Sequence, residues 1–216
     1  MIISIDGPAG SGKSTVAEIL AKKLGFSHFN SGSLYRAVTA YVIKNNLDVD
    51  VSFEEIAKLP LKVEFINGEQ HVFVDGTDFT NHLRDNIVSQ KSSYVSKFKP
   101  IRNMVDNCQH HFAANNNVVI EGRDIGSFVF PNAEHKFYLD CSVDVRAERR
   151  FKEEQAKGSN VSLEEIKLQI IARDKFDKEK PTAPLVVPKN AVVIDSTNLT
   201  AEQVAEIMFK KIKQTV

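Results

Sequence analysis

Short apolar runs alternate along the chain with stretches in which apolar residues recur every three or four positions. The run at 2–5 is too short for a buried helix and stops at a glycine-rich stretch, so it indicates a buried strand. Residues 13–24 place their apolar side chains on one helix face, and Gly25 is a typical helix end. The same patterns predict further strands at 118–120, 136–139 and 191–194, and further helices at about 33–45, 84–114, 144–180 and 200–213. Strands that alternate with helices predict a parallel sheet with right-handed crossovers.

Residues 61–79 have a different period, with apolar and polar positions alternating on both sides of Asn67-Gly68. Asn-Gly between two alternating runs is a strong signal for a β-hairpin, because the two-residue turn needs left-handed backbone at both positions. A hairpin within a strand-helix chain indicates a small inserted subdomain. Near the end of the chain, Thr200 and Gln203 have the spacing of a capping box for the last helix.

The composition is that of an ordinary globular protein, with 216 residues, of which 42% are apolar and 26% charged. Its 28 basic and 28 acidic residues cancel, which argues against binding nucleic acid or a membrane surface through bulk charge, so anion sites must be local. Cys108 and Cys141 lack the paired spacing of a disulfide scaffold or a zinc site, and a reducing cytoplasm is expected. The chain has neither a long apolar run nor a signal-peptide pattern, so we expect no membrane span.

The glycine-rich stretch after the first strand matches the Walker A pattern, Gly7-x4-Gly12-Lys13-Ser14. Glycines let backbone N–H groups point at phosphate oxygens, and the following helix N-terminus adds donors and partial positive charge. Lys13 can reach the β- and γ-phosphates, and the Ser14 hydroxyl can ligate Mg²⁺. The motif predicts binding of a nucleoside triphosphate, without saying where the phosphoryl group goes. The candidate ATP ligands in it are Gly7, Pro8, Ala9, Gly10, Ser11, Gly12, Lys13, Ser14 and Thr15.

Two arginines offer a second anion site. Arg36 lies one turn into a predicted helix, and Arg123 follows an apolar strand, at the carboxyl end of the sheet where open α/β sheets bind ligands. The fork of an arginine side chain matches phosphate with two hydrogen bonds. Taken singly, either arginine is more often a surface ion-pair residue. Beside a Walker A motif in a chain of this length, the two favour a small phosphotransferase.

Five segments occur in one order along the chain: IDGPAGSGKST, SGSLYRA, EGRDIGSFVFPNA, VRAERR, and RD-x-x-D followed by APL. Together they resemble the bacterial cytidylate kinases, a branch of the nucleoside monophosphate kinases, over nearly the whole chain. The resemblance implies an α/β P-loop fold of three layers, α/β/α, with a central parallel sheet, an inserted β-containing subdomain for the monophosphate and a helical lid. It divides a single kinase domain, 1–216, into a core at about 1–30, 115–145 and 185–216, the monophosphate-binding subdomain at about 31–114, and the lid at about 146–184.

The resemblance also implies an activity, the transfer of the γ-phosphoryl group of ATP, with Mg²⁺, to CMP or dCMP. It implies a cytoplasmic monomer that binds these small nucleotides and neither nucleic acid nor membranes. The residues implied for catalysis are Lys13, Arg36, Arg123 and Asp124. Those implied for CMP are Ser31, Tyr35, Arg36, Ser93, Arg102, Arg123, Asp124, Arg173, Asp177 and Lys180. In the lid, Arg149 and Arg150 are implied for ATP.

Two positions depart from the family pattern. Asn30 stands where the family usually has Asp, and Lys180 where it usually has Arg. Lys180 keeps the charge but lacks the fork of a guanidinium, which puts the geometry of base or phosphate recognition in question at that position. We still expect CMP to be preferred over UMP.

Three other hypotheses stay open. A different small P-loop kinase would act on AMP, dephospho-coenzyme A or shikimate. A nucleotide-driven switch would carry an NKxD-type guanine reader, which this chain lacks, and an inactive homologue would be expected to lack one of the residues implied for catalysis, all of which are present.

Several conspicuous residues have structural explanations that we expect to hold. The two cysteines are expected as buried hydrophobes, and His110-His111 as a solvated helix surface. Phe128 and Phe130 are expected in the core. The charged stretch at 144–180 is expected as a solvated helical pair.

Overall fold

In the computed structural model, which describes residues 1–156 and 158–214, the chain forms two compact units. One unit consists of Met1–Phe26 and Val119–Val216, and the other of Ser27–Val118. Position 157 of the expected lid and positions 215–216 of the expected kinase domain lie outside the described residues.

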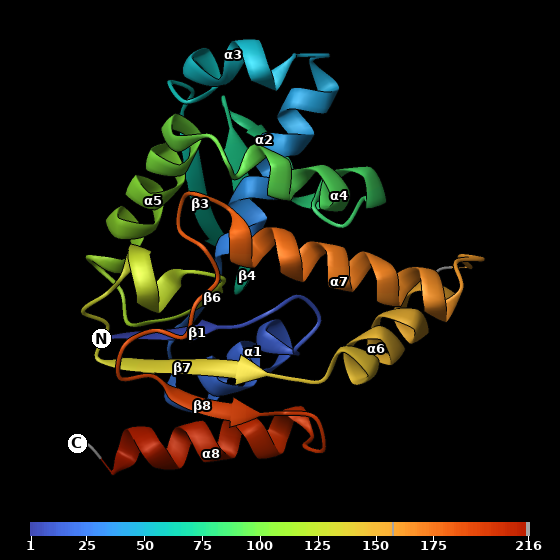
Figure 1. The fold of residues 1–216 in the computed structure, drawn as a ribbon. Helices are drawn as coiled ribbons and strands as arrows, with labels where there is room; N and C mark the ends of the chain where they lie inside the picture. Colours follow the sequence, from blue (N-terminus) through green and yellow to red (C-terminus); the bar gives the residue numbers. More distant parts are fainter. Residues whose placement is uncertain (157, 215–216) are drawn as a thin grey trace. The chain divides into compact units, whose positions relative to one another are not determined.

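The first unit is built on a sheet whose strands lie in the order β6-β1-β7-β8. These strands are β1 (Ile2–Asp6), β6 (Val118–Gly122), β7 (His135–Asp140) and β8 (Val192–Asp195). β1 pairs with β7 and β7 with β8, both in parallel, and Figure 1 shows β7 and β8 side by side. The structure therefore confirms the predicted α/β fold with a central parallel sheet.

Helices pack on this sheet and beside it. They are α1 (Lys13–Leu24), α6 (Val143–Ala156), α7 (Leu163–Glu179) and α8 (Ala201–Lys213). Leu20 of α1 and Met208 of α8 join Ile5 and Leu139 of the strands in one fully buried core. Each such side chain contributes about 1.5–3 kcal/mol of transfer free energy to folding. In Figure 1, α6 and α7 lie side by side, and a small cluster of apolar side chains joins them.

The second unit holds the predicted hairpin. β3 (Leu61–Ile66) and β4 (Glu69–Val74) pair antiparallel around Asn67 and Gly68, which both adopt positive φ, 53° and 83°. A short strand, β5 (Thr77–Asp78), adds to β4. The other elements of this unit are β2 (Ser27–Asn30), α2 (Ser31–Lys44), α3 (Val49–Ile56), a 3₁₀ turn (Thr80–His82), α4 (Asn86–Val95) and α5 (Lys99–Ala113).

Helix ends follow the signals in the sequence. Gly25 ends α1 in the left-handed conformation, with φ 70°, and its N–H bonds the last carbonyls of the helix. Thr200 and Gln203 form the predicted capping box of α8, and Ser162 and Glu165 form a second one at α7. Local sequence therefore sets where these helices begin and end.

The sequence pattern missed or misplaced some elements. It gave no indication of β2 or α3, and the single helical stretch expected at 84–114 is two helices, α4 and α5. Pro100 explains the second start, because proline is tolerated only in the first turn of a helix.

Two expectations about burial were wrong. Phe128 was expected in the core, but it is 49% exposed, and Phe130 is half-buried. The segment 144–180 is a helical pair as expected, but it is not solvated throughout, because Arg146 and Glu154 are buried. Arg146 is buried because it has a carboxylate partner on the neighbouring helix, which charge counting along the sequence does not show.

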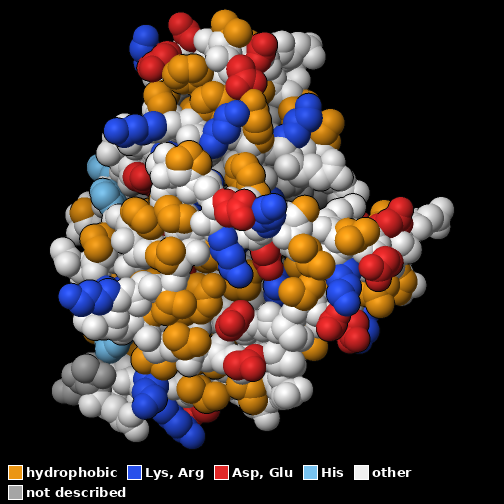
Figure 2. Space-filling view, viewed as in Figure 1, with side chains coloured by type: hydrophobic (Ala, Val, Ile, Leu, Met, Phe, Trp, Pro, Cys, Tyr) orange, Lys and Arg blue, Asp and Glu red, His pale blue; other side chains and the backbone are white. Residues whose placement is uncertain are grey.

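The expectation for the histidine pair is confirmed, and that for the cysteines is confirmed for one of the two. His110 and His111 are exposed, and Figure 2 shows histidine side chains at the surface beside α5. Cys141 is buried, whereas Cys108 is only partly so. Among the described residues, no helix is both long and apolar enough to cross a membrane.

Candidate active site

The loop between β1 and α1 has the shape that its glycines allow. Gly10 and Gly12 have φ of 74° and 89°, values that side-chain-bearing residues rarely adopt. A Cβ on Gly7 would lie 2.2 Å from the carbonyl oxygen of Leu139, so this part of the loop passes directly against β7. Gly12 provides no capping side chain for α1, which leaves the start of the helix suited to an anion.

Lys13 lies inside this loop. The residue is 4% exposed, and its Nζ donates to the carbonyl oxygen of Pro8 at 2.6 Å and to Ser11 Oγ at 3.3 Å. Burial, together with the nearby charge of Arg123, lowers the pKa of Lys13 to about 7. The ammonium is therefore held by neutral oxygens, which a phosphate oxygen would replace with a stronger, charge-assisted bond.

Ser14 and Glu121 place two oxygen ligands beside the loop. Ser14 Oγ, at the start of α1, donates to Glu121 Oε1 at 2.6 Å, and Glu121 is buried near the end of β6. A hydroxyl and a carboxylate are hard oxygen donors of the kind that Mg²⁺ prefers. In the described part of the chain, no group of three or more His, Cys, Asp or Glu side chains is placed to hold a metal ion. The pair fits a Mg²⁺ that takes its other ligands from phosphates and water.

Arg123 is held between the loop and α7. Its Nε donates to Asp177 Oδ2 at 3.0 Å and its guanidinium donates to the carbonyl oxygen of Gly7 at 3.3 Å. Asp177 also accepts from Arg173 Nε at 3.3 Å. Burial alone would raise the pKa of Asp177, but the charges of Arg123 and Arg173 hold it below its ordinary value. The Asp177 carboxyl is thus ionised, and it fixes two arginines at once.

The three arginines of α6 have different surroundings. Arg146 makes a two-pronged bond to Asp174, at 2.6 and 3.1 Å, and donates to the carbonyl oxygen of Ala9 at 3.1 Å. Arg149 lies beside the loop, with one guanidinium nitrogen 3.6 Å from the position of a Cβ on Gly12.

Arg150 differs from both, because it pairs along its own helix with Glu154, at 3.2 Å. Of the two arginines implied for ATP, the structure therefore brings Arg149 to the loop and pairs Arg150 with its own helix. Acidic and basic side chains gather together over α6 and α7 in Figure 2.

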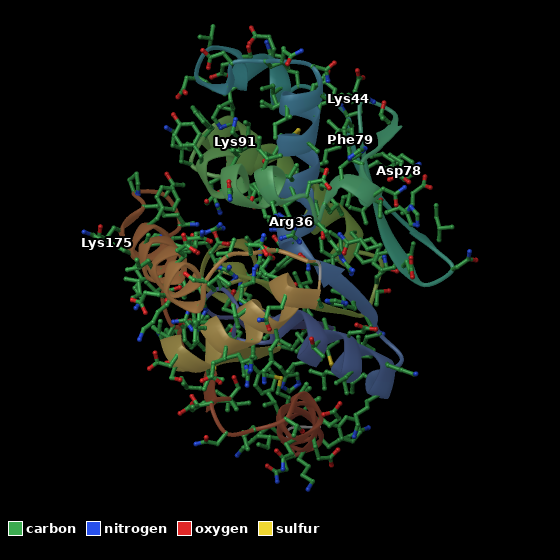
Figure 3. All side chains as sticks on the ribbon, turned by 90° about the vertical axis from the view of Figure 1, so that its right-hand side faces the viewer. Arg36, Lys44, Asp78, Phe79, Lys91 and Lys175 are labelled. Carbon is green, nitrogen blue, oxygen red and sulfur yellow. The ribbon has the colours of Figure 1, made fainter. Side chains whose placement is uncertain are left out.

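The second unit has its own cluster around the start of α2. Asn30 Oδ1 caps the helix by accepting from the N–H of Ser33 at 3.1 Å, and it also accepts from Arg36 at 3.2 Å. The side-chain amide of Gln70 in β4 makes two hydrogen bonds with the backbone of Asn30. The backbone is close to these side chains at Gly32, where a Cβ would lie 3.1 Å from the Arg36 guanidinium and 3.2 Å from Asn30 Oδ1. Figure 3 shows Arg36 on α2.

The other residues of this unit that are implied for the acceptor lie on α2, α4 and α5. Ser31 and Tyr35 are buried on α2. The buried guanidinium of Arg102, from α5, lies 5.8 Å from the centre of the Tyr35 ring. Ser93, on α4, is half-buried, and its carbonyl oxygen accepts from Ser96. α2 and α5 thus bring Tyr35 and Arg102 together.

Four further residues of the first unit contact candidate site segments and were not assigned from the sequence. They are Asp6, Glu121, Asp174 and Ser196, whose hydroxyl donates to the carbonyl oxygen of Ser11 at 3.2 Å. Asp6 and Glu121 carry a usable signal, because each is an ionisable residue at or near the carboxyl end of a buried apolar strand. Asp174 stands in the RD-x-x-D segment, which gives it no role of its own, and Ser196 carries no signal.

Known proteins resemble this chain over nearly its full length. A family model described as cytidylate kinase matches residues 3–214. The cytidylate kinase of Caldanaerobacter subterraneus is 42% identical over 212 residues, which cover 98% of this chain and 94% of the relative. The cytidylate kinases of Thermotoga maritima and Clostridioides difficile are each 38% identical, covering 98% of this chain and 96% and 98% of their own.

Two solved structures share the fold at low identity. An uncharacterised protein from Eubacterium ventriosum superposes with a TM-score of 0.55 at 14% identity, over 99% of this chain and 98% of its own. TT1252 from Thermus thermophilus does so with a TM-score of 0.51 at 15% identity, over 100% and 97%. The family predicted from the sequence motifs is confirmed by the relatives, and the chain belongs to the cytidylate kinase family.

Proposed function

We propose that this protein transfers the γ-phosphoryl group of ATP to CMP and dCMP, giving ADP and the corresponding diphosphate. The observation that carries the proposal is the placement of two basic side chains, Lys13 and Arg123, at the P-loop. Lys13 lies inside the loop, and Arg123 lies against the Gly7 carbonyl at its beginning. Membership of the family supports the nature of the acceptor.

ATP binds in this proposal through the P-loop, residues 7–15. Backbone N–H groups and Lys13 contact its phosphates, and Arg149 approaches from α6. When Mg²⁺ is bound, it neutralises charge between the phosphates, and Ser14 and Glu121 are the residues that would hold it. Arg150 would reach the triphosphate only by leaving Glu154.

CMP is the acceptor in this proposal, and the residues that the family resemblance implies for it are its ligands. Arg36 and Arg123 hold its phosphate, and Ser93, Arg102 and Asp124 read the cytosine edge, which offers an amino donor and ring acceptors. Groups of this kind reject another base because they would be left without partners. The ribose hydroxyls contact Arg173 and Asp177. Ser31, Tyr35 and Lys180 complete the acceptor site.

The chemistry needs no general base. The second ionisation of a phosphate monoester has a pKa of about 6, so the attacking oxygen of CMP is already anionic near neutral pH. That oxygen attacks the γ-phosphorus, the bond to the bridging β–γ oxygen breaks, and ADP leaves with the electron pair. Lys13, Arg123 and Arg36 offset the repulsion between the two anions and hold the reacting atoms in line.

Cell location and oligomeric state belong to the same proposal. A cytoplasmic location is supported by two cysteines without a disulfide and by the cellular occurrence of nucleotides. We propose a monomer, because in the family-based division of the chain every implied substrate ligand comes from one copy.

The choice of acceptor is tested with ATP and one monophosphate at a time. We expect ADP to form rapidly with CMP and dCMP, and at least about tenfold more slowly with UMP and AMP, since each wrong base leaves buried polar groups unpaired. Coupled-enzyme measurement of ADP checks this. Preference for AMP, or ADP formation that is independent of every acceptor, would contradict the proposal.

Arg123→Ala tests whether Arg123 acts on the acceptor phosphate rather than on ATP. We expect kcat with CMP to fall roughly 100- to 1000-fold, because a positive charge on the acceptor phosphate is lost, while the Kd for MgATP changes only a few-fold. The matched control is Lys175→Ala, on α7, whose side chain is exposed and labelled in Figure 3. The control should behave as wild type, and equal losses of kcat and ATP affinity in Arg123→Ala count against the assignment.

ATP binding is expected to take up a proton at Lys13. Its pKa of about 7 leaves the side chain mostly neutral at pH 8, and a bound triphosphate favours the charged form. Calorimetry in two buffers of different ionisation enthalpy should therefore show uptake of roughly half to one proton at pH 8 and almost none at pH 6. Lys13→Arg is the control, because arginine stays charged throughout and should abolish the difference. The same heat in both buffers at pH 8 for the wild type would refute this.

A further inference from the structure

The carboxylate of Asp6 contacts the segment that follows Arg123. Asp6 is the last residue of β1, has no exposed surface, and is followed by the first glycine of the P-loop. Its Oδ1 accepts a hydrogen bond from the backbone N–H of Ile125, and its Oδ2 accepts one from Gly126. Both bonds are 2.7 Å long. One side chain therefore joins the start of the P-loop to the backbone just beyond Arg123.

The turn that receives these bonds is unusual. Residues Ile125–Val129 form a single π-helical turn, a structure that is rare and often found at functional sites. The first N–H groups of a helical turn have no acceptor within it, so they need one from elsewhere. A carboxylate can accept from two donors at once, whereas an amide side chain offers a single oxygen. The two carboxylate oxygens of Asp6 thus provide one acceptor for each of the two N–H groups.

The backbone approaches Asp6 closely at Gly126. A Cβ there would lie 2.5 Å from Ser4 Oγ and 3.0 Å from Asp6 Oδ2. Since no side chain fits, the turn can lie against β1 only with glycine at this position. The contact leaves the turn little freedom to move sideways.

The side chain of Arg123 is also bound at the start of the P-loop. Its guanidinium donates to the carbonyl oxygen of Gly7, the residue after Asp6. The backbone beyond Arg123 is fixed by the Asp6 carboxylate, and its side chain by the Gly7 carbonyl oxygen and the Asp177 carboxylate. We propose that Asp6 is a positioning residue that sets Arg123 relative to the P-loop, so that donor and acceptor phosphates meet in line. The inference rests on the proposed function.

Burial makes the ionised form of Asp6 unfavourable. Burial raises the pKa of Asp6 to about 7, against the effect of the two N–H bonds. Asp124 raises it further and Lys13 lowers it. Keeping a buried carboxylate is unfavourable for folding, so a residue that only filled this space would be better neutral.

The first test is Asp6→Asn, which keeps the shape and turns one acceptor into a donor that faces an N–H group. We expect kcat with CMP to fall about 10- to 100-fold, as misplacement of a reacting group does, while KM for MgATP changes less than about threefold. The melting temperature should fall modestly, because one buried N–H group loses its acceptor. A fall in melting temperature with no selective loss of kcat would show a merely structural role.

The matched control is Asp140→Asn. Asp140 ends the neighbouring strand β7, and the hydrogen bond of its carboxylate goes to the N–H of Cys141, not to the turn after Arg123. This control should keep kcat and KM close to wild type. A loss equal to that of Asp6→Asn would overturn the proposal.

The decisive measurement is a double-mutant cycle of Asp6→Asn with Arg123→Ala. If Asp6 acts through Arg123, its substitution should cost less than about threefold in kcat once Arg123 is alanine. Independent, multiplying losses would overturn the proposal. Should Asp6→Asn fail to fold, Asp6→Ser, which keeps one acceptor, takes its place in the same cycle.

The cycle also separates this inference from the proposed function. If wild-type protein does not phosphorylate CMP, the proposed function fails and the role of Asp6 falls with it. If the wild type and Arg123→Ala behave as expected but the losses multiply, only the role of Asp6 is wrong.

Discussion

A cation buried at the carboxyl end of a sheet must have a partner, because an unpaired buried charge costs several kcal/mol or more. Arg146 meets this requirement with a two-pronged carboxylate bond that solvent hardly reaches. Lys13 meets it with neutral oxygens, the Pro8 carbonyl at 2.6 Å and Ser11 Oγ at 3.3 Å. Arg123 combines the Asp177 carboxylate, at 3.0 Å, with the Gly7 carbonyl oxygen, at 3.3 Å. A carbonyl oxygen is a weaker partner than a phosphate oxygen, so these two cations can exchange it for a nucleotide. Neutral partners of this kind leave a cation suited to bind an anionic substrate.

Buried carboxylates hold several parts of the site in place. The chain is neutral overall, yet Asp6, Glu121, Asp174 and Asp177 are all buried in one unit, each in contact with a different functional segment. Asp177 holds Arg123 and Arg173, Glu121 holds the hydroxyl of Ser14, and Asp6 holds the turn beyond Arg123. In the other unit, the cap beside Arg36 is the neutral Asn30, which adds no negative charge where an acceptor phosphate would bind.

The parts of the structure that could be predicted from sequence were those that local chemistry decides. The Walker A glycines, the Asn67-Gly68 turn and the Thr200 capping box each specify a backbone shape within a few residues, and each was found. β2 was missed because four residues with one fully buried side chain leave no period to detect. Phe128 was misplaced because burial depends on what packs against a residue, which the apolar character alone does not reveal.

The site, too, contains residues that local sequence reveals and others that only the fold reveals. Lys13 and Arg123 could be found because they follow strands, whereas the partner of Arg146 lies 28 positions away and follows from the packing of α6 on α7. The motif identified the arginines of α6 as a group, but only the fold shows that Arg146 is committed to Asp174 and Arg150 to Glu154. Sequence gives the candidate charges, and the tertiary structure decides which of them are already neutralised.

If one chain holds two anionic nucleotides with their phosphates in line, a single compound that joins adenosine and cytidine through a polyphosphate chain should fill both sites. Calorimetry with that compound should show one molecule bound per chain, at least about tenfold more tightly than ATP, with both ATP and CMP excluded, because linking two sites makes the second contact intramolecular. Binding no tighter than that of ATP, with CMP still able to bind beside it, would show that the two nucleotides are not held in line.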